Sequence, residues 1–158
     1  MTIRVRYPGA HIGQDLIFAD DTGSDFMTLL DSDIDDLDNF YRLQGFNVNA
    51  ISPQLIRPIP VNTFSGNEEW HDLYQVEVAF PDTNGALLTT WDRINVLVLA
   101  DPIGAPTPDR VNGPWLRYKL HTSTAPTRRV EMGIFRIKSA IARGTSVGVQ
   151  PPEARVMR

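Results

Sequence analysis

Short apolar stretches that alternate with polar residues constrain this chain most. Residues 2–7 and 74–80 place an apolar side chain at nearly every second position, which is the period of a half-buried β-strand. Pro8-Gly9 closes the first stretch, and Asn84-Gly85 follows the second as a hairpin signal. Together with further short apolar runs, this pattern predicts six or more short strands. The chain is therefore expected to be mainly β, a closed barrel or a sandwich with one or two short helices.

The other expected strands are shorter, and prolines mark one of them. Three prolines between Ser52 and Pro60 favour an extended edge segment and discourage helix. Four short apolar runs predict strands at residues 16–19, 26–30, 87–91 and 94–99. Residues 134–138 predict a late strand, while residues 115–120 fit either a short helix or a strand.

One helix is expected directly after the strand at 26–30. Ile34, Leu37 and Tyr41 fall on one helical face. Ser32 is placed to cap the N-terminus, and the many aspartates of the first turns suit the positive end of the helix dipole. The spacing Asp31-x-Asp33-x-Asp35 lacks the glycine and glutamate that a calcium loop needs, so a solvated helix start is the better interpretation.

Length and composition limit the class of protein. The chain has 158 residues, of which 42% are hydrophobic and none is cysteine. That length suits one domain, expected at residues 1–143 with a loose tail at 144–158. No disulfide or thiolate site is possible, and no apolar run approaches the roughly 20 residues of a membrane-spanning helix. With no apolar leader at the N-terminus, an intracellular, cytoplasmic protein without membrane contact is expected.

Charge is strongly segregated along the chain. Residues 1–109 hold seventeen acidic residues and five arginines, whereas residues 110–158 hold ten basic residues and two glutamates. Basic residues in the last third are dispersed and lack interleaved aromatics, so nucleic acid is an unlikely partner. Packing of this third against the acidic remainder, within one chain or across a dimer, is the alternative.

The most informative motif is Phe18-Ala19-Asp20-Asp21-Thr22-Gly23-Ser24. An apolar strand delivers an aspartate into a tight turn, where glycine permits a backbone conformation that other residues resist. This turn resembles the Asp-Thr-Gly-Ser active-site turn of the retropepsin-like aspartic proteases. The resemblance implies that Asp21 is catalytic, that Thr22 and Gly23 shape and lock the turn, and that Ser24 hydrogen-bonds the catalytic carboxylate.

The order of the later segments is similar to the retropepsin order over roughly residues 2–120. A flap hairpin would have arms at residues 55–64 and 70–80. A second apolar strand would then lead to a glycine turn at Val111-Asn112-Gly113 and a short helix. The resemblance implies substrate-binding residues on the flap: Phe64, Ser65, Gly66 and Trp70.

A chain with one such turn holds half of the chemistry. Peptide hydrolysis of this kind needs two carboxylates that share one proton, so the resemblance implies a homodimer with Asp21 contributed by each copy. Water is the nucleophile, the substrate is a polypeptide, and no metal or organic cofactor is implied.

Asp20 beside the catalytic position and Asn112 in the second turn depart from the family pattern. They leave open a second hypothesis, a dimerising interaction domain that keeps the protease fold without cutting.

Overall fold

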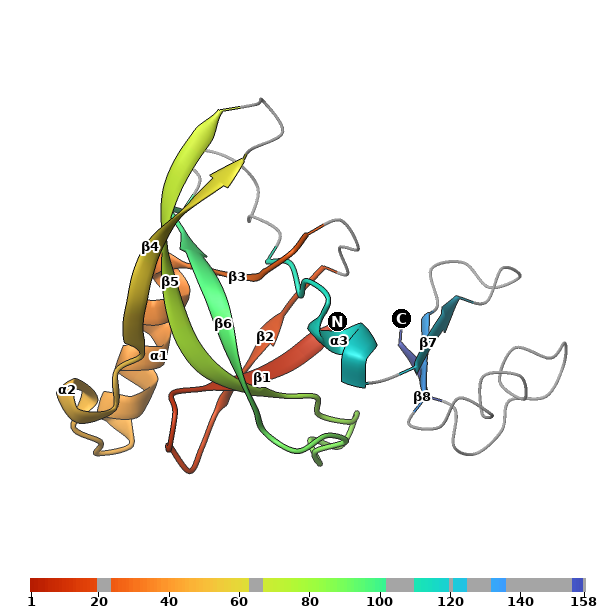
Figure 1. Ribbon diagram of the computed structural model, residues 1–158. Coiled ribbons are helices and arrows are strands. Elements are labelled where there is room, and N and C mark those ends of the chain that lie inside the picture. The colour runs from red at the N-terminus through yellow and green to blue at the C-terminus, as the bar shows by residue number, and fades with distance from the viewer. Residues whose placement is uncertain are drawn as a thin grey trace, which may run out of the picture. The chain divides into compact units, whose positions relative to one another are not determined.

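The computed structural model describes residues 1–19, 24–62, 67–101, 110–119, 121–124, 132–135 and 155–157 (Figure 1). The chain divides into two compact units, Met1–Gly113 and Pro114–Arg158. The boundary expected near residue 143 lies outside the described residues.

Unit 1 is built around one six-stranded sheet. Its strands are β1 (Thr2–Arg6), β2 (Gln14–Ile17), β3 (Met27–Leu30), β4 (Gln54–Asn62), β5 (Glu68–Ala79) and β6 (Asp92–Leu99). The order is β2-β1-β5-β6-β3, and β4 pairs with β5 beside this path. All ladders are antiparallel except that of β3 with β6, which is parallel. The prediction of a mainly β chain is confirmed.

The sheet does not close into the expected barrel. Strands β2 and β3 stand at the two ends of the order, and no ladder joins them among the described residues. The physical reason lies in the chain between them: Ala19 and Thr28, at the facing ends, both bond to Val111 or its neighbours instead of to each other. A third segment therefore occupies the position where a closing ladder would form.

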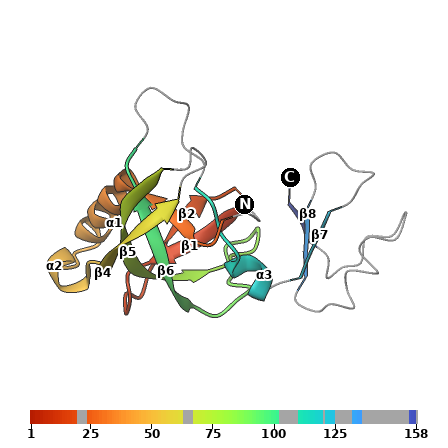
Figure 2. The same cartoon turned by 45° about the horizontal axis from the view of Figure 1, so that its top comes forward.

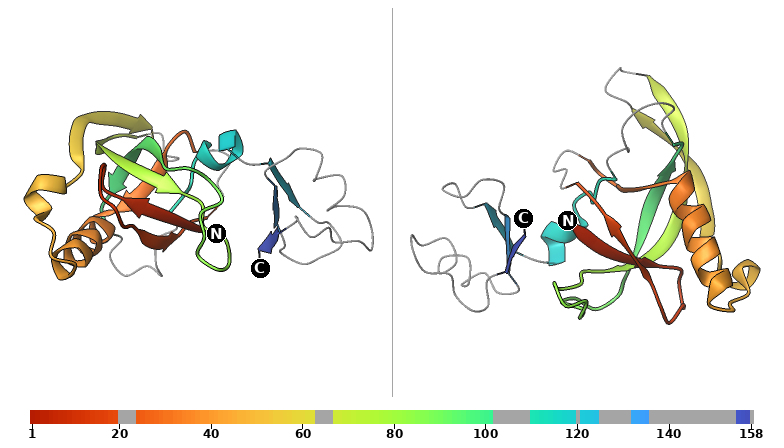
Figure 3. Two further views of the ribbon diagram at one scale, coloured as in Figure 1. Left: turned by 90° about the horizontal axis from the view of Figure 1, so that it is seen from below. Right: turned by 180° about the vertical axis from the view of Figure 1, so that it is seen from behind.

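One helix covers part of the sheet, as Figures 1 and 3 show from opposite sides. Helix α1 spans Asp31–Leu43, and the short helix α2 (Val48–Ile51) follows it. Leu37 and Tyr41 of α1 are fully buried, as is Tyr7 of the chain after β1. The Tyr7 hydroxyl donates to the Asp38 carboxylate at 2.6 Å. Burial, together with this carboxylate, raises the pKa of Tyr7 far above its ordinary value.

The predicted cap of α1 was wrong. Ser32 lies inside the first turn, and both its N–H and its hydroxyl donate to the Asp101 carboxylate. The Asp33 carboxylate instead accepts the N–H of Leu30 at 2.9 Å, which satisfies one of the orphan donors at the start of the helix. The predicted apolar face is confirmed at Leu37 and Tyr41, but Asp33 is buried beside them while Ile34 is only half-buried.

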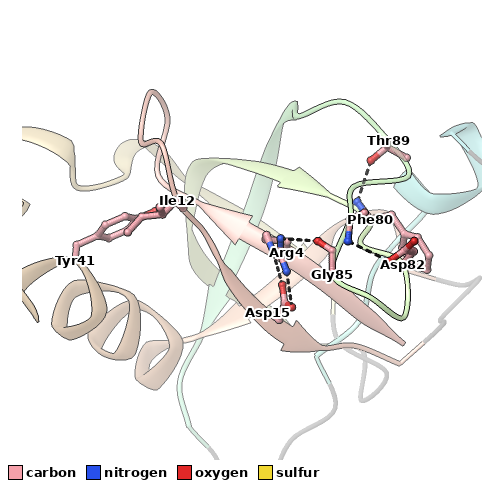
Figure 4. A network of polar contacts seen from close by, with 9 residues as sticks. Arg4, Ile12, Asp15, Tyr41, Phe80, Asp82, Gly85 and Thr89 are labelled. Atoms are coloured by element: carbon pink, nitrogen blue, oxygen red, sulfur yellow. Dashed lines mark hydrogen bonds and ion pairs between the residues drawn. The ribbon is translucent and has the colours of Figure 1, made fainter. Parts of the chain in front are cut away.

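Polar side chains fix the loop between β5 and β6 (Figure 4). The Asp82 carboxylate accepts the N–H groups of Asn84 and Ala86, and Gly85 takes a positive φ of 81°, so the predicted Asn-Gly turn is confirmed. The strand predicted at 87–91 was wrong, since only Leu87 forms an isolated bridge. The Thr89 hydroxyl accepts the N–H of Phe80 and so takes the place of a ladder bond.

Ion pairs tie β1 to its neighbours. Arg4 contacts Asp15 of β2 through two hydrogen bonds and also donates to the carbonyl oxygen of Gly85 (Figure 4). Arg6 and Arg93 both donate to Glu77 of β5, from β1 and β6 respectively. Three adjacent strands are thus held by one carboxylate, which these arginines keep in its charged form.

Unit 2 contains helix α3 (Trp115–Lys119) and a three-stranded antiparallel sheet. Its strands are β7 (His121–Thr124), β8 (Met132–Phe135) and β9 (Arg155–Met157), with β8 in the middle. The predicted late strand is confirmed at residues 134–135, and residues 136–138 lie outside the described residues. In the expected loose tail, Arg155–Met157 form a strand because their backbone groups pair with β8; the remainder of the tail is not described.

Among the helices in the described part of the chain, none combines the length and the apolar character that crossing a membrane requires.

Candidate active-site region

Four residues of the predicted catalytic turn, Asp20, Asp21, Thr22 and Gly23, lie outside the described residues. The structure does describe the two ends that hold them. Strand β2 ends at Ile17, and the chain runs on through Phe18 to Ala19; β3 begins at Met27, after Ser24. The Ser24 hydroxyl donates to the carbonyl oxygen of Phe26 at 2.7 Å. Its predicted hydrogen bond to the catalytic carboxylate involves Asp21 and so stays a prediction.

A third segment lies between these two ends. Residues 110–113, here called the crossing segment, form a parallel bridge between Val111 and Ala19. Ala19 donates its N–H to the carbonyl oxygen of Arg110 at 2.6 Å, and Asn112 donates to the carbonyl oxygen of Ala19 at 3.1 Å. The crossing segment runs in teal beside the ends of β2 and β3 in Figure 1.

The other edge of the crossing segment bonds to β3. Thr28 donates its N–H to the carbonyl oxygen of Val111, and its hydroxyl accepts the N–H of Val111, both at 2.9 Å. Backbone and side chain of Thr28 therefore satisfy both polar groups of Val111. The crossing segment lies between the two chain ends that carry the predicted catalytic turn, because Arg110 and Asn112 bond to Ala19 while Val111 bonds to Thr28.

Gly113 ends the crossing segment with a close backbone contact. Its φ is +56°, and a Cβ atom placed on it would lie 2.6 Å from the carbonyl carbon of Phe26 and 2.8 Å from the nitrogen of Met27. Only glycine tolerates both the positive φ and this approach without strain. The structure thus brings Val111 and Gly113 of the predicted second turn against the strand that leaves the predicted catalytic turn.

Asn112 is fully buried where the family pattern has an apolar residue. Its side-chain nitrogen donates to the sulfur of Met1 at 3.4 Å. The Met1 ammonium group in turn donates to the carbonyl oxygen of Phe18 at 2.6 Å, and Phe18 donates its N–H to Met1. Met1 and Phe18 thereby add one more hydrogen-bonded pair to the β1–β2 ladder, next to the predicted catalytic turn.

A buried ion pair anchors the crossing segment to α1. The Arg110 guanidinium donates two hydrogen bonds to the Asp33 carboxylate, from Nε at 2.6 Å and from a terminal nitrogen at 2.5 Å. Asp33 is only 1% exposed. The hydrogen bond to Asp33 raises the pKa of Arg110 above the ordinary value of a guanidinium, so Arg110 carries its positive charge throughout the physiological pH range. The sequence interpretation missed both residues; the available signal was a carboxylate four residues before Leu37, on the apolar face of the helix.

Strands β4 and β5 form a hairpin where the flap is predicted; that it acts as a flap stays a prediction. Eight residue pairs join them, and a bulge interrupts the ladder between Leu55 and Arg57. Among the described residues, residues 68–71 pair only with β4, whereas residues 72–75 pair with both β4 and β6. The outer part of the hairpin therefore runs past the end of β6, as Figures 1 and 2 show.

Of the four predicted substrate-binding residues, Trp70 is among the described residues and the other three are not. Trp70 pairs with Pro60 and is 65% exposed, an unusual exposure for so large an apolar side chain. Phe64, Ser65 and Gly66 lie outside the described residues. The predicted edge strand is confirmed, since among the strands of the described residues β4 pairs only with β5. Its two prolines, Pro58 and Pro60, have no N–H to offer a further strand.

Metal ligation finds no support in the described ranges, which contain no cluster of three His, Asp or Glu side chains that could hold an ion. Within the spacing Asp31-x-Asp33-x-Asp35, the Asp33 carboxylate is committed to Arg110 and to the N–H of Leu30.

Comparison with known proteins finds no match for this chain. No protein-family model, no curated protein and no solved structure matches this chain. Any functional conclusion therefore has to come from the residues and their arrangement.

Proposed function

We propose that this protein is a retropepsin-like aspartic endopeptidase, active as a homodimer. Asp21 of each copy would contribute one carboxylate to a pair that shares a proton. The charged carboxylate would accept a proton from water as the water attacks the peptide carbonyl carbon. The protonated partner would donate a hydrogen bond to the carbonyl oxygen, and later a proton reaches the leaving nitrogen.

The crossing segment is the observation that carries this proposal. The motif predicts a catalytic turn between two strands, and the retropepsin order places a second, glycine-containing turn beside it. Arg110 and Asn112, the two neighbours of Val111, bond to Ala19 before the turn, and Val111 itself bonds to Thr28 after it. Gly113 packs on the backbone of Phe26. Eighty residues separate these segments in the sequence, so their meeting is independent of the four-residue motif.

The hairpin of β4 and β5 supports a polypeptide substrate. Its outer part runs past the end of β6, and within the described part of the chain residues 68–71 and their β4 partners pair with no third strand. A polypeptide in extended form can be held by such a hairpin through backbone hydrogen bonds, with alternate side chains entering pockets. Trp70, exposed on this hairpin, offers a large apolar surface for substrate side chains.

A cleavage assay tests the proposal. Wild type and Asp21→Asn are incubated with a mixed peptide library from about pH 3.5 to 7, the range in which paired carboxylates titrate, and the products are read by mass spectrometry. Wild type is expected to cut with a bell-shaped pH dependence, and Asp21→Asn is expected to leave every peptide intact. Asp36→Asn makes the same change at an exposed position of α1 and should cut like wild type.

The rival hypothesis, a dimerising interaction domain, predicts a different result. Wild type would then leave the library intact while it remains a folded dimer, and Asp21→Asn would differ from it at most in stability. Cuts that persist in Asp21→Asn would also contradict the proposal, because they would come from another mechanism or a contaminant.

A further inference from the structure

The Asp33–Arg110 pair lies at a junction of three chain segments. Asp33 follows β3 by three residues at the start of α1, and its carboxylate also accepts the N–H of Leu30, the last residue of β3. Arg110 begins the crossing segment, and its own carbonyl oxygen accepts the N–H of Ala19. One ion pair therefore connects the end of β3, the start of α1 and the strand that enters the predicted catalytic turn.

Its geometry is that of a rigid clamp. A bidentate guanidinium–carboxylate pair fixes both distance and orientation, which a single contact does not. Asp33 is almost completely buried and the Arg110 side chain is 22% exposed, so the pair is weakly screened by water and salt. The backbone bonds of the crossing segment to Ala19 and Thr28 begin at the residue that this clamp holds.

Other arginine pairs of unit 1 have a different setting. Arg6 and Arg93 meet Glu77 in the middle of the sheet, and Arg4 meets Asp15 on the β1–β2 hairpin. Arg42 meets Asp38 within α1 at 3.6 Å, on an exposed surface. Among the arginine–carboxylate pairs of the described residues, the Arg110 pair alone reaches the crossing segment, which gives the clamp a role that sheet stability alone does not require.

We propose that Asp33 and Arg110 are positioning residues for the hydrolysis proposed above, on which this inference rests. The clamp holds the crossing segment against Ala19 and Thr28, which lie on either side of the predicted catalytic turn, and so would position the chain that carries Asp21. Neither residue takes part in proton transfer. A misplacement of a catalytic group by about 1 Å lowers the rate by about a hundredfold, so loss of the clamp should lower kcat and leave KM nearly unchanged.

The variant that tests this is Asp33→Asn/Arg110→Gln. Removing only one partner would leave a buried charge without its counterion and could unfold the protein. The double variant is neutral, and the Asn oxygen can still accept the N–H of Leu30, but the bidentate clamp is gone. Arg110→Lys keeps the charge without the bidentate geometry, and Arg93→Met removes a different arginine pair as the matched control.

Two readouts are combined for each variant. The first is kcat and KM on one peptide that wild type cuts, measured per folded dimer. The second is amide hydrogen exchange of Ala19, Thr28 and Asn112, the N–H donors of the backbone bonds between the crossing segment and the ends of the turn. The double variant should lose about ten- to a hundredfold in kcat, with KM within about twofold, and these three amides should exchange faster. Arg110→Lys should fall between it and wild type, and Arg93→Met should match wild type in both readouts.

Three results would overturn the inference. An unchanged kcat per folded dimer in the double variant would show that the clamp contributes to stability only. Unchanged exchange at the three amides would show that the crossing segment keeps its place without the clamp. If wild type and Asp21→Asn are equally inactive, the proposed function fails and the catalytic role with it, while the exchange measurement still decides whether the clamp exists.

Discussion

At the scale of single residues, Gly113 has the most demanding position. Gly113→Ala requires a positive φ for a side-chain-bearing residue and a Cβ atom within 2.8 Å of three backbone atoms of Phe26 and Met27. We expect a loss of about 2 kcal/mol or more in the free energy of unfolding, since left-handed backbone alone costs roughly 1 to 2 kcal/mol for an L-residue and the contact adds to it. Denaturant unfolding measures this loss.

Gly45→Ala is the matched control for Gly113→Ala. Gly45 also has a positive φ, of 82°, but no atom lies within 4 Å of the added Cβ. It should cost only the backbone strain of about 1 kcal/mol. Equal losses at the two positions would contradict the close contact between Gly113 and the strand that leaves the turn.

Residue types explain which site residues could be found from sequence. Asp21 and Gly113 were predicted because glycine and aspartate in a turn motif carry a local signal; the close backbone approach of Gly113 is observed, and the role of Asp21 stays a prediction. Arg110 and Asp33 were missed because 77 positions separate them, and no local pattern pairs two charges that are brought together by the fold. Ser32 was predicted as the helix cap from local preference, but its hydroxyl donates a hydrogen bond to the carboxylate of Asp101, just after β6.

At the scale of elements, Glu77 links three strands, and its titration should be visible in stability. Burial alone would raise the pKa of Glu77, but the hydrogen bonds from Arg93 and Arg6 outweigh it and lower the pKa below its ordinary value. The unfolded chain then binds the proton more readily than the folded one. The stabilisation is present above the unfolded pKa of about 4.3 and is lost as the pH falls through the lower folded value.

Glu77→Gln should remove this contribution. We expect it to lower the free energy of unfolding at pH 7 by about 1 to 3 kcal/mol, the range for hydrogen bonds to charged groups, and to weaken the decline of stability below about pH 5. Denaturant unfolding at a series of pH values measures both effects. Glu68→Gln changes an exposed position on the same strand and should alter neither; a wild-type decline in Glu77→Gln would place the acid sensitivity elsewhere.

The elements themselves were largely predictable, for a physical reason. Alternation with period two reflects a strand with one face covered, and it identified β1 and β5, whereas a short apolar run located β6. The apolar run at residues 87–91 gave a wrong prediction, because there the Thr89 hydroxyl replaces a backbone partner. Local sequence patterns cannot predict which distant segments pair. Nothing local indicates that β3 runs parallel to β6, or that residues 110–113 occupy the gap between β2 and β3.

At the scale of the whole molecule, charge follows the division into units. Unit 1 carries seventeen acidic residues, six arginines and no lysine, whereas unit 2 carries nine basic and two acidic residues. Two copies of unit 1 would therefore repel each other over distances longer than about 10 Å at low ionic strength. Any measurement of the proposed homodimer should be made at salt concentrations that screen this repulsion.

The proposed dimer makes a quantitative prediction for mixed chains. If each active site needs Asp21 from both copies, a dimer of wild type with Asp21→Asn is inactive. Adding an equal amount of Asp21→Asn to wild type, with full exchange of subunits, leaves one quarter of all dimers as wild-type pairs, so cleavage should fall to about half of that of wild type alone. Asp36→Asn should leave cleavage at its full value or above. Activity that is unaffected by added Asp21→Asn, in samples whose subunits are shown to exchange, would mean that one chain carries a complete site and would exclude a catalytic pair shared across a two-fold axis.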